Sequence, residues 1–336
     1  MTPSKPVLDM TQGTVVARPR QKFANAKAWT RQSLSPADWT VKIDDAVKKE
    51  LDGVVRMTRR QALPVMLLDP IDFDLPASRA MMGRVKNILD DGHGFTVIDR
   101  LPMDDWSEDE ARAMYWLLGR LMSRQVAQTA KGEIFREVHN DGNKSDSGRD
   151  RSTTDRRLIY HNDNSANRNL PNYTSLLCLN KAKEGGHSEY VTVYSIFNAL
   201  ADEAPVELDR LFKPFYHDRL GIQSAGESPL LWAPALAWDG QKLLGRYSIN
   251  KIGGGYRIAG EEMDNETRSA LETVIAVVGE KQLSARFLQE RGQIQVINNR
   301  EGLHHRDDFV DGDTPATRRH LVRFWFRNQG RAFFDG

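Results

Sequence analysis

The sequence of 336 residues contains a single cysteine, Cys178. A lone cysteine excludes an intrachain disulfide, and it also excludes zinc sites and iron–sulfur clusters that need several cysteines from one chain. A protein that makes so little use of cysteine is expected to be cytoplasmic.

Long apolar runs are also missing from the sequence. No run approaches the roughly 20 residues that a membrane-spanning helix needs. Residues 1–29 carry charges throughout and lack the apolar core of a signal peptide. We therefore expect no membrane partner.

The chain has no marked excess of charge of either sign. It carries 47 basic and 46 acidic residues, a net charge of +1, which gives no general attraction to nucleic acid. Hydrophobic residues make up 40% of the sequence and charged residues 28%, as in ordinary globular proteins. We expect a small-molecule substrate and no nucleic-acid partner, and a homo-oligomer is left open.

The N-terminal part shows helical patterns. Residues 1–25 have no periodicity and predict a flexible arm, followed by one domain over residues 26–336 whose first part, about 26–135, is helical. Helices are predicted over Ala77–Asp90 and after the capping box that begins at Ser107. Phe95–Asp99 predicts a short strand between them.

The remainder of the chain has β character. Asp264–Val278 interrupts it as a predicted helix. These features favour an α+β fold, an antiparallel barrel or sandwich with inserted helices and with packed helices from the N-terminal third around it. The predicted strands are Tyr173–Leu179, Tyr190–Tyr194, Gly292–Asn299 and His320–Phe326.

A polar, charged segment at residues 140–157 precedes these strands. It has almost nothing to bury, so it is either a solvated or disordered loop or a mobile lid that leads into His161.

A candidate metal site begins at His161. In an extended strand, residues two apart point to the same side, so His161 and Asp163 can converge on one ion. A third ligand is available from His304 or His305, which follow another predicted strand. Two histidines and one carboxylate form the triad of non-haem iron(II) oxygenases. The same ligands also suit catalytic zinc, and any one of the histidines could be an ordinary core residue.

Arginines alternate along the last predicted strand. Period-two geometry puts Arg319 and Arg323 on one face and Arg318 on the other. Inside a barrel, the first two need an anion, which a dicarboxylate cosubstrate would supply. The alternative is an edge strand with solvated arginines.

Together these motifs resemble the TauD/TfdA-like family of the clavaminate-synthase-like oxygenases, over about Tyr160 to Arg327. The resemblance rests on their order and spacing: Tyr160-His-Asn-Asp-Asn164, Pro171-Asn-Tyr173, Leu176-Leu-Cys-Leu179, Gly185-Gly-His-Ser188, Asn298-Asn-Arg300, Leu303-His-His-Arg306 and Arg318-Arg-His-Leu-Val-Arg323.

The resemblance implies a double-stranded β-helix (jelly-roll) core at about residues 158–330, with Fe(II) as cofactor and 2-oxoglutarate and O2 as cosubstrates. His161, Asp163 and His304 occupy the metal-ligand positions, and Arg319 and Ser188 the positions that bind the distal carboxylate of 2-oxoglutarate. The sequence departs from the family pattern in having His305 after the distal histidine and His187 before Ser188, so His305 is kept as an alternative ligand.

The activity that the resemblance implies is hydroxylation of an unactivated C–H bond, with release of succinate and CO2. Arg323, Asn164 and His187 are the candidate substrate-binding residues. They suggest a small polar acidic molecule, such as an amino acid or derivative, a sulfonate or a phosphonate. Desaturation, cyclisation or epimerisation are alternative outcomes of the same chemistry. A zinc hydrolase and a non-catalytic jelly-roll binding protein are the rival functions.

Overall fold

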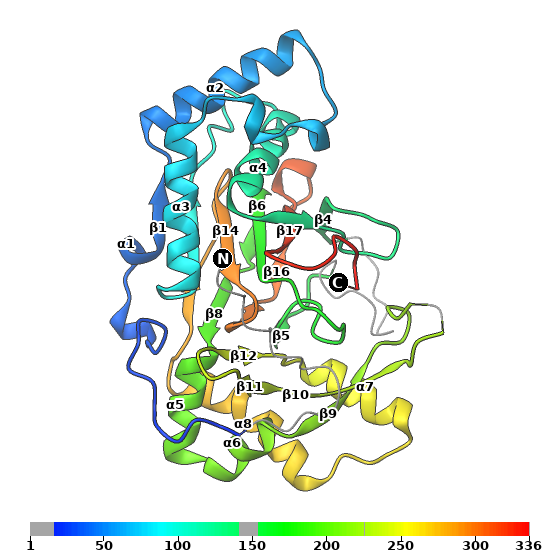
Figure 1. Cartoon of the computed structure of the whole chain (residues 1–336). Helices are drawn as coiled ribbons and strands as arrows, with labels where there is room; N and C mark the ends of the chain where they lie inside the picture. Colours follow the sequence, from blue (N-terminus) through cyan, green and yellow to red (C-terminus); the bar gives the residue numbers. More distant parts are fainter. Residues whose placement is uncertain (1–16, 141–153, 225, 336) are drawn as a thin grey trace, which may run out of the picture.

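A computed structural model of the chain describes residues 17–140, 154–224 and 226–335 (Figure 1). Two β-sheets face each other across a cavity, and helices cover the outer side of each sheet. This arrangement is a double-stranded β-helix core with flanking helices, so the predicted α+β fold class is confirmed.

The larger sheet has seven strands. Its order is β1-β2-β14-β6-β17-β3, and β4 also pairs with β17. The pair β1–β2 is parallel, and the other pairs are antiparallel. The strands are β1 (Thr40–Lys42), β2 (Phe95–Asp99), β3 (Arg124–Val126), β4 (Arg136–His139), β6 (Tyr173–Asn180), β14 (Ile294–Asn298) and β17 (His320–Arg327).

The smaller sheet has the order β13-β8-β15-β5, and all its pairs are antiparallel. Its strands are β5 (Leu158–His161), β8 (Ser188–Thr192), β13 (Ala285–Phe287) and β15 (Gly302–Arg306). Three two-stranded pairs complete the β structure: β7 (Glu184–Gly185) with β16 (Phe309–Val310), β9 (Pro214–Asp218) with β10 (Leu230–Pro234), and β11 (Leu236–Trp238) with β12 (Leu243–Gly245).

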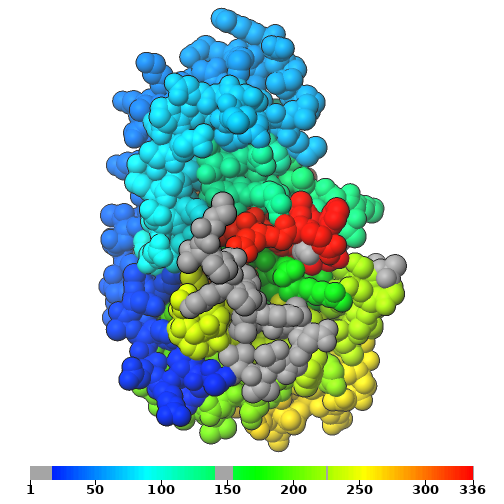
Figure 2. All heavy atoms as spheres, in the orientation of Figure 1, coloured from blue at the N-terminus to red at the C-terminus, as the bar shows by residue number. Residues whose placement is uncertain are grey.

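Two long helices cover the outer face of the larger sheet (Figure 1), α3 (Pro76–Asp90) and α4 (Glu108–Met122), and a third, α2 (Asp45–Arg60), packs on these two helices. The short helix α1 (Pro36–Trp39) precedes β1. Val322, Phe324 and Phe326 of β17 are buried against these helices in one hydrophobic cluster. The alternate residues of β17 therefore face the cavity. Figure 2 shows α2 and the segment after it, in blue, standing out at one end of the molecule.

A second group of helices consists of α5 (Val193–Glu203), α6 (Pro205–Leu211), α7 (Ile249–Ala259) and α8 (Asn265–Glu280). Helix α5 packs on β8 and β15 of the smaller sheet, α6 and α8 pack on α5, and α7 packs on β9 and β10. Their apolar side chains form a second hydrophobic cluster with Val191 and Leu303. Of the helices in the described ranges, none combines the length and apolar character required to cross a bilayer.

Two predicted helices are present in the structure, and one predicted strand ends earlier than expected. The helix predicted over Ala77–Asp90 is α3, and the capping box at Ser107 opens α4, with hydrogen bonds in both directions between Ser107 and Glu110. The predicted strand Tyr190–Tyr194 is wrong at its C-terminal end. Thr192 caps α5 by accepting a hydrogen bond from Ser195 N–H, so the chain turns helical immediately after Thr192.

Two predicted segments fall largely outside the described residues. Residues 1–16 of the predicted arm are not described, and neither are residues 141–153 of the candidate lid. The described end of the arm lies on α5: Phe23 N–H donates to Asn198 Oδ1, and the Phe23 ring contacts the rings of Tyr194 and Phe197.

Candidate active site

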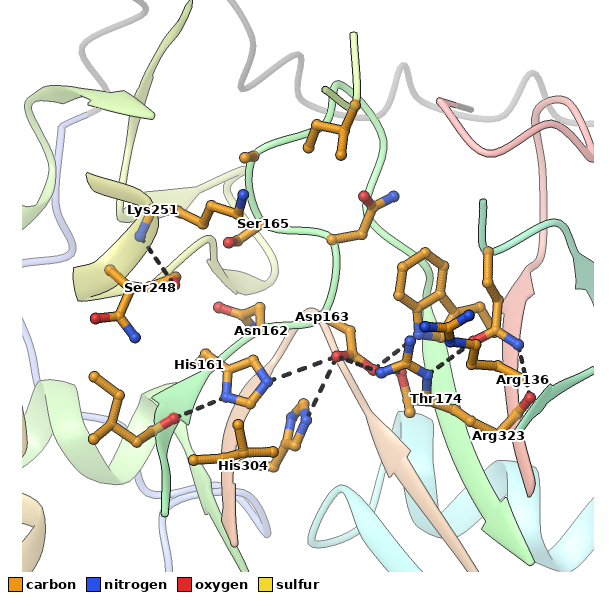
Figure 3. A pocket seen from close by; sticks show the side chains of 18 of the residues that line it. Arg136, His161, Asn162, Asp163, Ser165, Thr174, Ser248, Lys251, His304 and Arg323 are labelled. Atoms are coloured by element: carbon orange, nitrogen blue, oxygen red, sulfur yellow. Dashed lines mark hydrogen bonds and ion pairs between the residues drawn. The ribbon is translucent and has the colours of Figure 1, made fainter. Parts of the chain in front are cut away.

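Three predicted ligands meet at the edge of the cavity (Figure 3). His161 is the last residue of β5, Asp163 follows two residues later, and His304 lies opposite His161 on β15. Asp163 Oδ1 is 3.7 Å from His161 Nε2 and 3.8 Å from His304 Nε2. One atom from each residue lies within 4.8 Å of the others, which is the spacing of a set that can hold one metal ion.

The second oxygen of Asp163 is held by two other side chains. Trp325 Nε1–H donates to Oδ2 over 2.8 Å and Thr174 Oγ1–H over 3.0 Å. Oδ1 is thereby directed toward the two histidines. Burial alone would raise the pKa of Asp163, but Arg323 and the histidines hold this pKa well below its usual range, so the carboxylate is charged.

Two asparagines position the backbone around Asp163. The Asn299 side chain accepts from Asp163 N–H over 2.8 Å and donates to Asp163 O over 3.1 Å. Asn162 donates to Asn299 O and Gly302 O, and its own Oδ1 accepts from Tyr247 N–H. These bonds tie the turn after β5 to the turn that leads into β15.

The structure distinguishes His304 from its neighbour His305. His304 faces His161 across the two strands, and burial, followed by the nearby His161, lowers the pKa of His304 to about 3. Its ring is therefore neutral, as a metal ligand must be. His305 stacks on Tyr160 on the other face of β15, and its Nε2 accepts a hydrogen bond from Arg157 Nε–H over 2.8 Å.

Arg319 is a buried cation in the same cavity. Arg319 is 6% exposed, whereas Arg318 is exposed, and both residues precede the first residue of β17. Within the described residues, no carboxylate lies within 4.0 Å of its guanidinium group. Burial lowers the pKa of Arg319 to about 10, so an anion bound beside it would be strongly favoured. Ser188, also buried, lines the cavity at the start of β8.

The residues before Ser188 approach Arg319 closely. Gly185 and Gly186 have φ of 72° and 73°, a conformation that favours glycine. A Cβ atom on Gly186 would lie 3.5 Å from Arg319 Cδ and Nε. The two glycines thus turn the chain beside the buried guanidinium group.

The predicted substrate-binding residues separate into two groups. Arg323 lines the cavity, with Nη1 3.4 Å from Asp163 Oδ1 and Nε donating to Gln128 Oε1. Asn164 also lines it, and its side chain donates to Phe334 O near the C-terminus. His187 is not among the described residues that line the cavity; it lies beside Asp307, at 3.6 Å. Successive side chains of an extended chain point in opposite directions. Because Ser188 faces the cavity, the side chain of His187 is directed away from it.

The cavity has a volume of about 1150 Å³ and extends well beyond the triad. Its lining includes polar residues that the sequence did not predict, among them Gln295 and Lys251. Gln295, 2% exposed on β14, has no side-chain partner for its Oε1 among the described residues. Lys251, on α7, lies on the far side of His161 from Arg323 (Figure 3). In Figure 2 the C-terminal residues, in red, lie at the surface beside the green segment that follows β5.

Two curated relatives cover most of the chain. FR-33289 synthase of Streptomyces rubellomurinus is 25% identical over 326 residues, which are 94% of this chain and 93% of that protein. The taurine hydroxylase-like protein SAT17 of Stachybotrys chartarum is 26% identical over 315 residues, 90% of this chain and 79% of that protein.

Solved structures show the same fold at lower identity. Asparagine oxygenase in complex with Fe(II), 2S,3S-3-hydroxyasparagine and succinate has a TM-score of 0.65 and 17% identity, over 86% of this chain and 93% of that one. The non-heme iron oxygenase OrfP in complex with Fe and alpha-ketoglutaric acid has a TM-score of 0.63 and 16% identity, over 86% and 94%.

Residues 64–325 match the family described as "Taurine catabolism dioxygenase TauD, TfdA family". This match covers most of the chain, including the triad, Arg319 and Arg323. It agrees with the His-Asp-His set and with the buried Arg319, which has no carboxylate partner among the described residues. The chain belongs to the TauD/TfdA family of iron(II)- and 2-oxoglutarate-dependent dioxygenases.

Proposed function

We propose that this enzyme hydroxylates an unactivated C–H bond of a small polar molecule with an acidic group, and releases succinate and CO2. The observation that carries the proposal is the convergence, in one cavity, of a His-Asp-His triad and the buried Arg319, which pairs with no carboxylate of the described residues. A triad alone would also suit zinc, whereas the arginine calls for an anionic cosubstrate.

His161, Asp163 and His304 are the residues that would hold Fe(II). Their donor set, two imidazoles and one carboxylate, is the one that non-haem iron(II) oxygenases use. Three protein ligands leave further coordination positions open for small molecules. When bound, iron and 2-oxoglutarate supply the oxidising chemistry, and the protein orients the substrate and excludes competing reactions.

Arg319 and Ser188 would bind the distal carboxylate of 2-oxoglutarate. A guanidinium group can grip a carboxylate with two parallel hydrogen bonds, and burial makes such charge-assisted bonds strong. Ser188 is buried in the same cavity, and its hydroxyl can donate to the same carboxylate. The Gln295 amide is a further polar group available to the bound molecules.

Arg323 and Asn164 are proposed to contact the substrate. Both line the cavity next to the triad, and Arg323 offers a positive charge. The names of similar proteins refer to asparagine, arginine and taurine, all small molecules with an acid group. These names support, for this enzyme, a substrate of the same kind.

The test is succinate formation from 2-oxoglutarate, with Fe(II) and O2, over a panel of amino acids, sulfonates and phosphonates. At least one compound is expected to stimulate succinate formation and to gain one oxygen atom by mass spectrometry. Loss of two hydrogens would instead indicate desaturation. Stimulation that persists in His161→Ala would show that the triad is not the site of the reaction.

A further inference from the structure

Helix α7 forms one wall of the cavity. Its first residues and its last turn line the space that lies away from the larger sheet. The helix can approach β9 closely because it contains three consecutive glycines: a Cβ on Gly254 would lie 2.8 Å from the Asp218 side chain, and one on Gly255 would lie 2.5 Å from Tyr216 O. Close packing at these two positions fixes the orientation of the wall.

Positive charge dominates the lining of the cavity. Among the described residues, six cationic side chains line it against two carboxylates, a surplus of four. Bound Fe(II) and doubly charged 2-oxoglutarate cancel each other's charge, so the surplus would persist in the loaded enzyme. The cations are Arg136, Lys251, Arg257, Arg306, Arg319 and Arg323, and the carboxylates are Asp163 and Asp218.

Four of the six cations already have a partner or an assigned role. Arg136 pairs with Glu133 at 3.0 Å, and Arg323 lies 3.4 Å from Asp163. Arg306 donates to backbone carbonyls, and Arg319 is assigned to 2-oxoglutarate.

Lys251 and Arg257 are the two that remain. In the described parts of the chain, no carboxylate lies within 4.0 Å of either charged group. Asp218 lies on the same wall, but its Oδ1 accepts a hydrogen bond from Leu220 N–H over 2.7 Å, and no ion pair joins it to α7. Lys251 and Arg257 are therefore cations that face the cavity with no counter-charge from the described residues.

We propose that Lys251 and Arg257 form a second anion subsite, and that the substrate carries two separated anionic groups. One group would reach Arg323 on the larger sheet, and the other would reach α7. In Figure 3, Lys251 and Arg323 lie on opposite sides of the triad, so a molecule that spans them passes the metal ligands. Its reactive carbon would then lie between its two acid groups. This inference rests on the proposed function and narrows its substrate class.

The size of the cavity agrees with an extended substrate. A volume of about 1150 Å³ lies just above the range of pockets for drug-sized ligands, roughly 300–1,000 Å³, which leaves room for an extended substrate beside 2-oxoglutarate. Both acid groups of such a substrate would be recognised by charge-assisted hydrogen bonds, whether each is a carboxylate, sulfonate, phosphonate or phosphate.

The experiment measures binding to the anaerobic enzyme loaded with Fe(II) and saturating 2-oxoglutarate. The probes are propylphosphonate, with one anionic group, and phosphonopropanoate, phosphonobutanoate and phosphonopentanoate, with two. Calorimetry gives each Kd, and the visible charge-transfer band of the iron-bound 2-oxoglutarate shows that the probe has not displaced the cosubstrate. At least one two-anion probe is expected to bind about tenfold more tightly than propylphosphonate, the effect of one charge-assisted contact.

Variants test whether the higher affinity for two-anion probes comes from α7. The double variant Lys251→Met/Arg257→Gln should lose this higher affinity, and Lys251→Arg should keep it. Lys281→Met is the matched control: this lysine lies on the surface at the end of α8, paired with Glu203, and its loss should leave the gain intact. Lys251 is half-buried and Arg257 exposed, so these variants are expected to fold, which circular dichroism checks.

Any one of three results would contradict the proposed subsite. The one-anion and two-anion probes could bind with equal affinity, or the gain in affinity could survive in the Lys251→Met/Arg257→Gln double variant. Alternatively, every two-anion probe could bind only by displacing 2-oxoglutarate. If the charge-transfer band forms but no two-anion probe gains affinity, only this inference fails. If the band never forms, the proposed function fails with it.

Discussion

His304 lies directly opposite His161 across the antiparallel strands β15 and β5, with ring centroids 4.3 Å apart. Strand pairing thus brings together two ligands that are far apart in the sequence. Because alternate residues of a strand face opposite sides, the same pairing directs His305 away from the metal position.

This pairing predicts different effects for the two neighbouring histidines. His304→Ala should lower the affinity for Fe(II) at least tenfold, because it removes a ligand, whereas His305→Asn should keep the affinity within about threefold. Anaerobic Fe(II) titration measures both constants, and thermal unfolding checks that each variant folds. If His305→Asn lowered the affinity for Fe(II) more than His304→Ala did, His305 and not His304 would be the metal ligand.

The bonds to Asp163 Oδ2 predict a positioning role for Trp325. Trp325→Phe keeps an aromatic ring but removes the Nε1–H donor at 2.8 Å, and should weaken Fe(II) binding by about 10–100-fold, as loss of such outer partners does. Thr174→Val should act in the same direction. Unchanged Fe(II) affinity in both variants would mean that the two histidines alone set the orientation of Asp163.

Arg319 is expected to determine the affinity for 2-oxoglutarate. Arg319→Met should raise the Kd of 2-oxoglutarate by about 10–100-fold, since a hydrogen bond to a charged group contributes roughly 1.5–3 kcal/mol. The neighbouring Arg318 is exposed, and Arg318→Met should leave this Kd unchanged. Equal effects of the two substitutions would refute the assignment.

The buried His217 predicts a pH-dependent contribution to stability. Burial, followed by the nearby Arg246, lowers the pKa of His217 to about 3 in the folded protein, against about 6.5 in the unfolded chain. Only the unfolded chain therefore takes up this proton as the pH falls from about 6.5 toward 3. The free energy of unfolding should fall by up to about 1.4 kcal/mol per pH unit on this account.

His217→Gln removes that contribution. Urea unfolding between pH 7 and pH 5 should show a shallower loss of stability in the variant than in the wild type. Parallel pH profiles would show that His217 is protonated in the folded protein.

Much of the candidate site could be predicted from local patterns. The sequence pattern paired His161 with Asp163 and separated Arg319 from Arg318, although Asp163 lies in the turn after β5 and both arginines precede β17. Helix α3 and the capping box of α4 are likewise local features, and the structure confirms them.

Other features depend on contacts between distant segments. Three consecutive glycines disfavour a helix, yet α7 forms because Gly254 and Gly255 pack against β9. Lys251 therefore could not be placed in the site beforehand. Trp325 and Thr174 come from different strands and meet only at Asp163, and His187 is turned from the cavity because Ser188 enters it.

The most direct test of this account is an anaerobic titration of Fe(II) into the protein with 2-oxoglutarate present, followed by visible absorption. The wild-type protein is expected to develop a charge-transfer band that saturates at one Fe(II) per chain, and His161→Ala is expected to develop none. A wild-type protein that binds Fe(II) but never develops the band, or that binds zinc tightly and hydrolyses substrates instead, would contradict it.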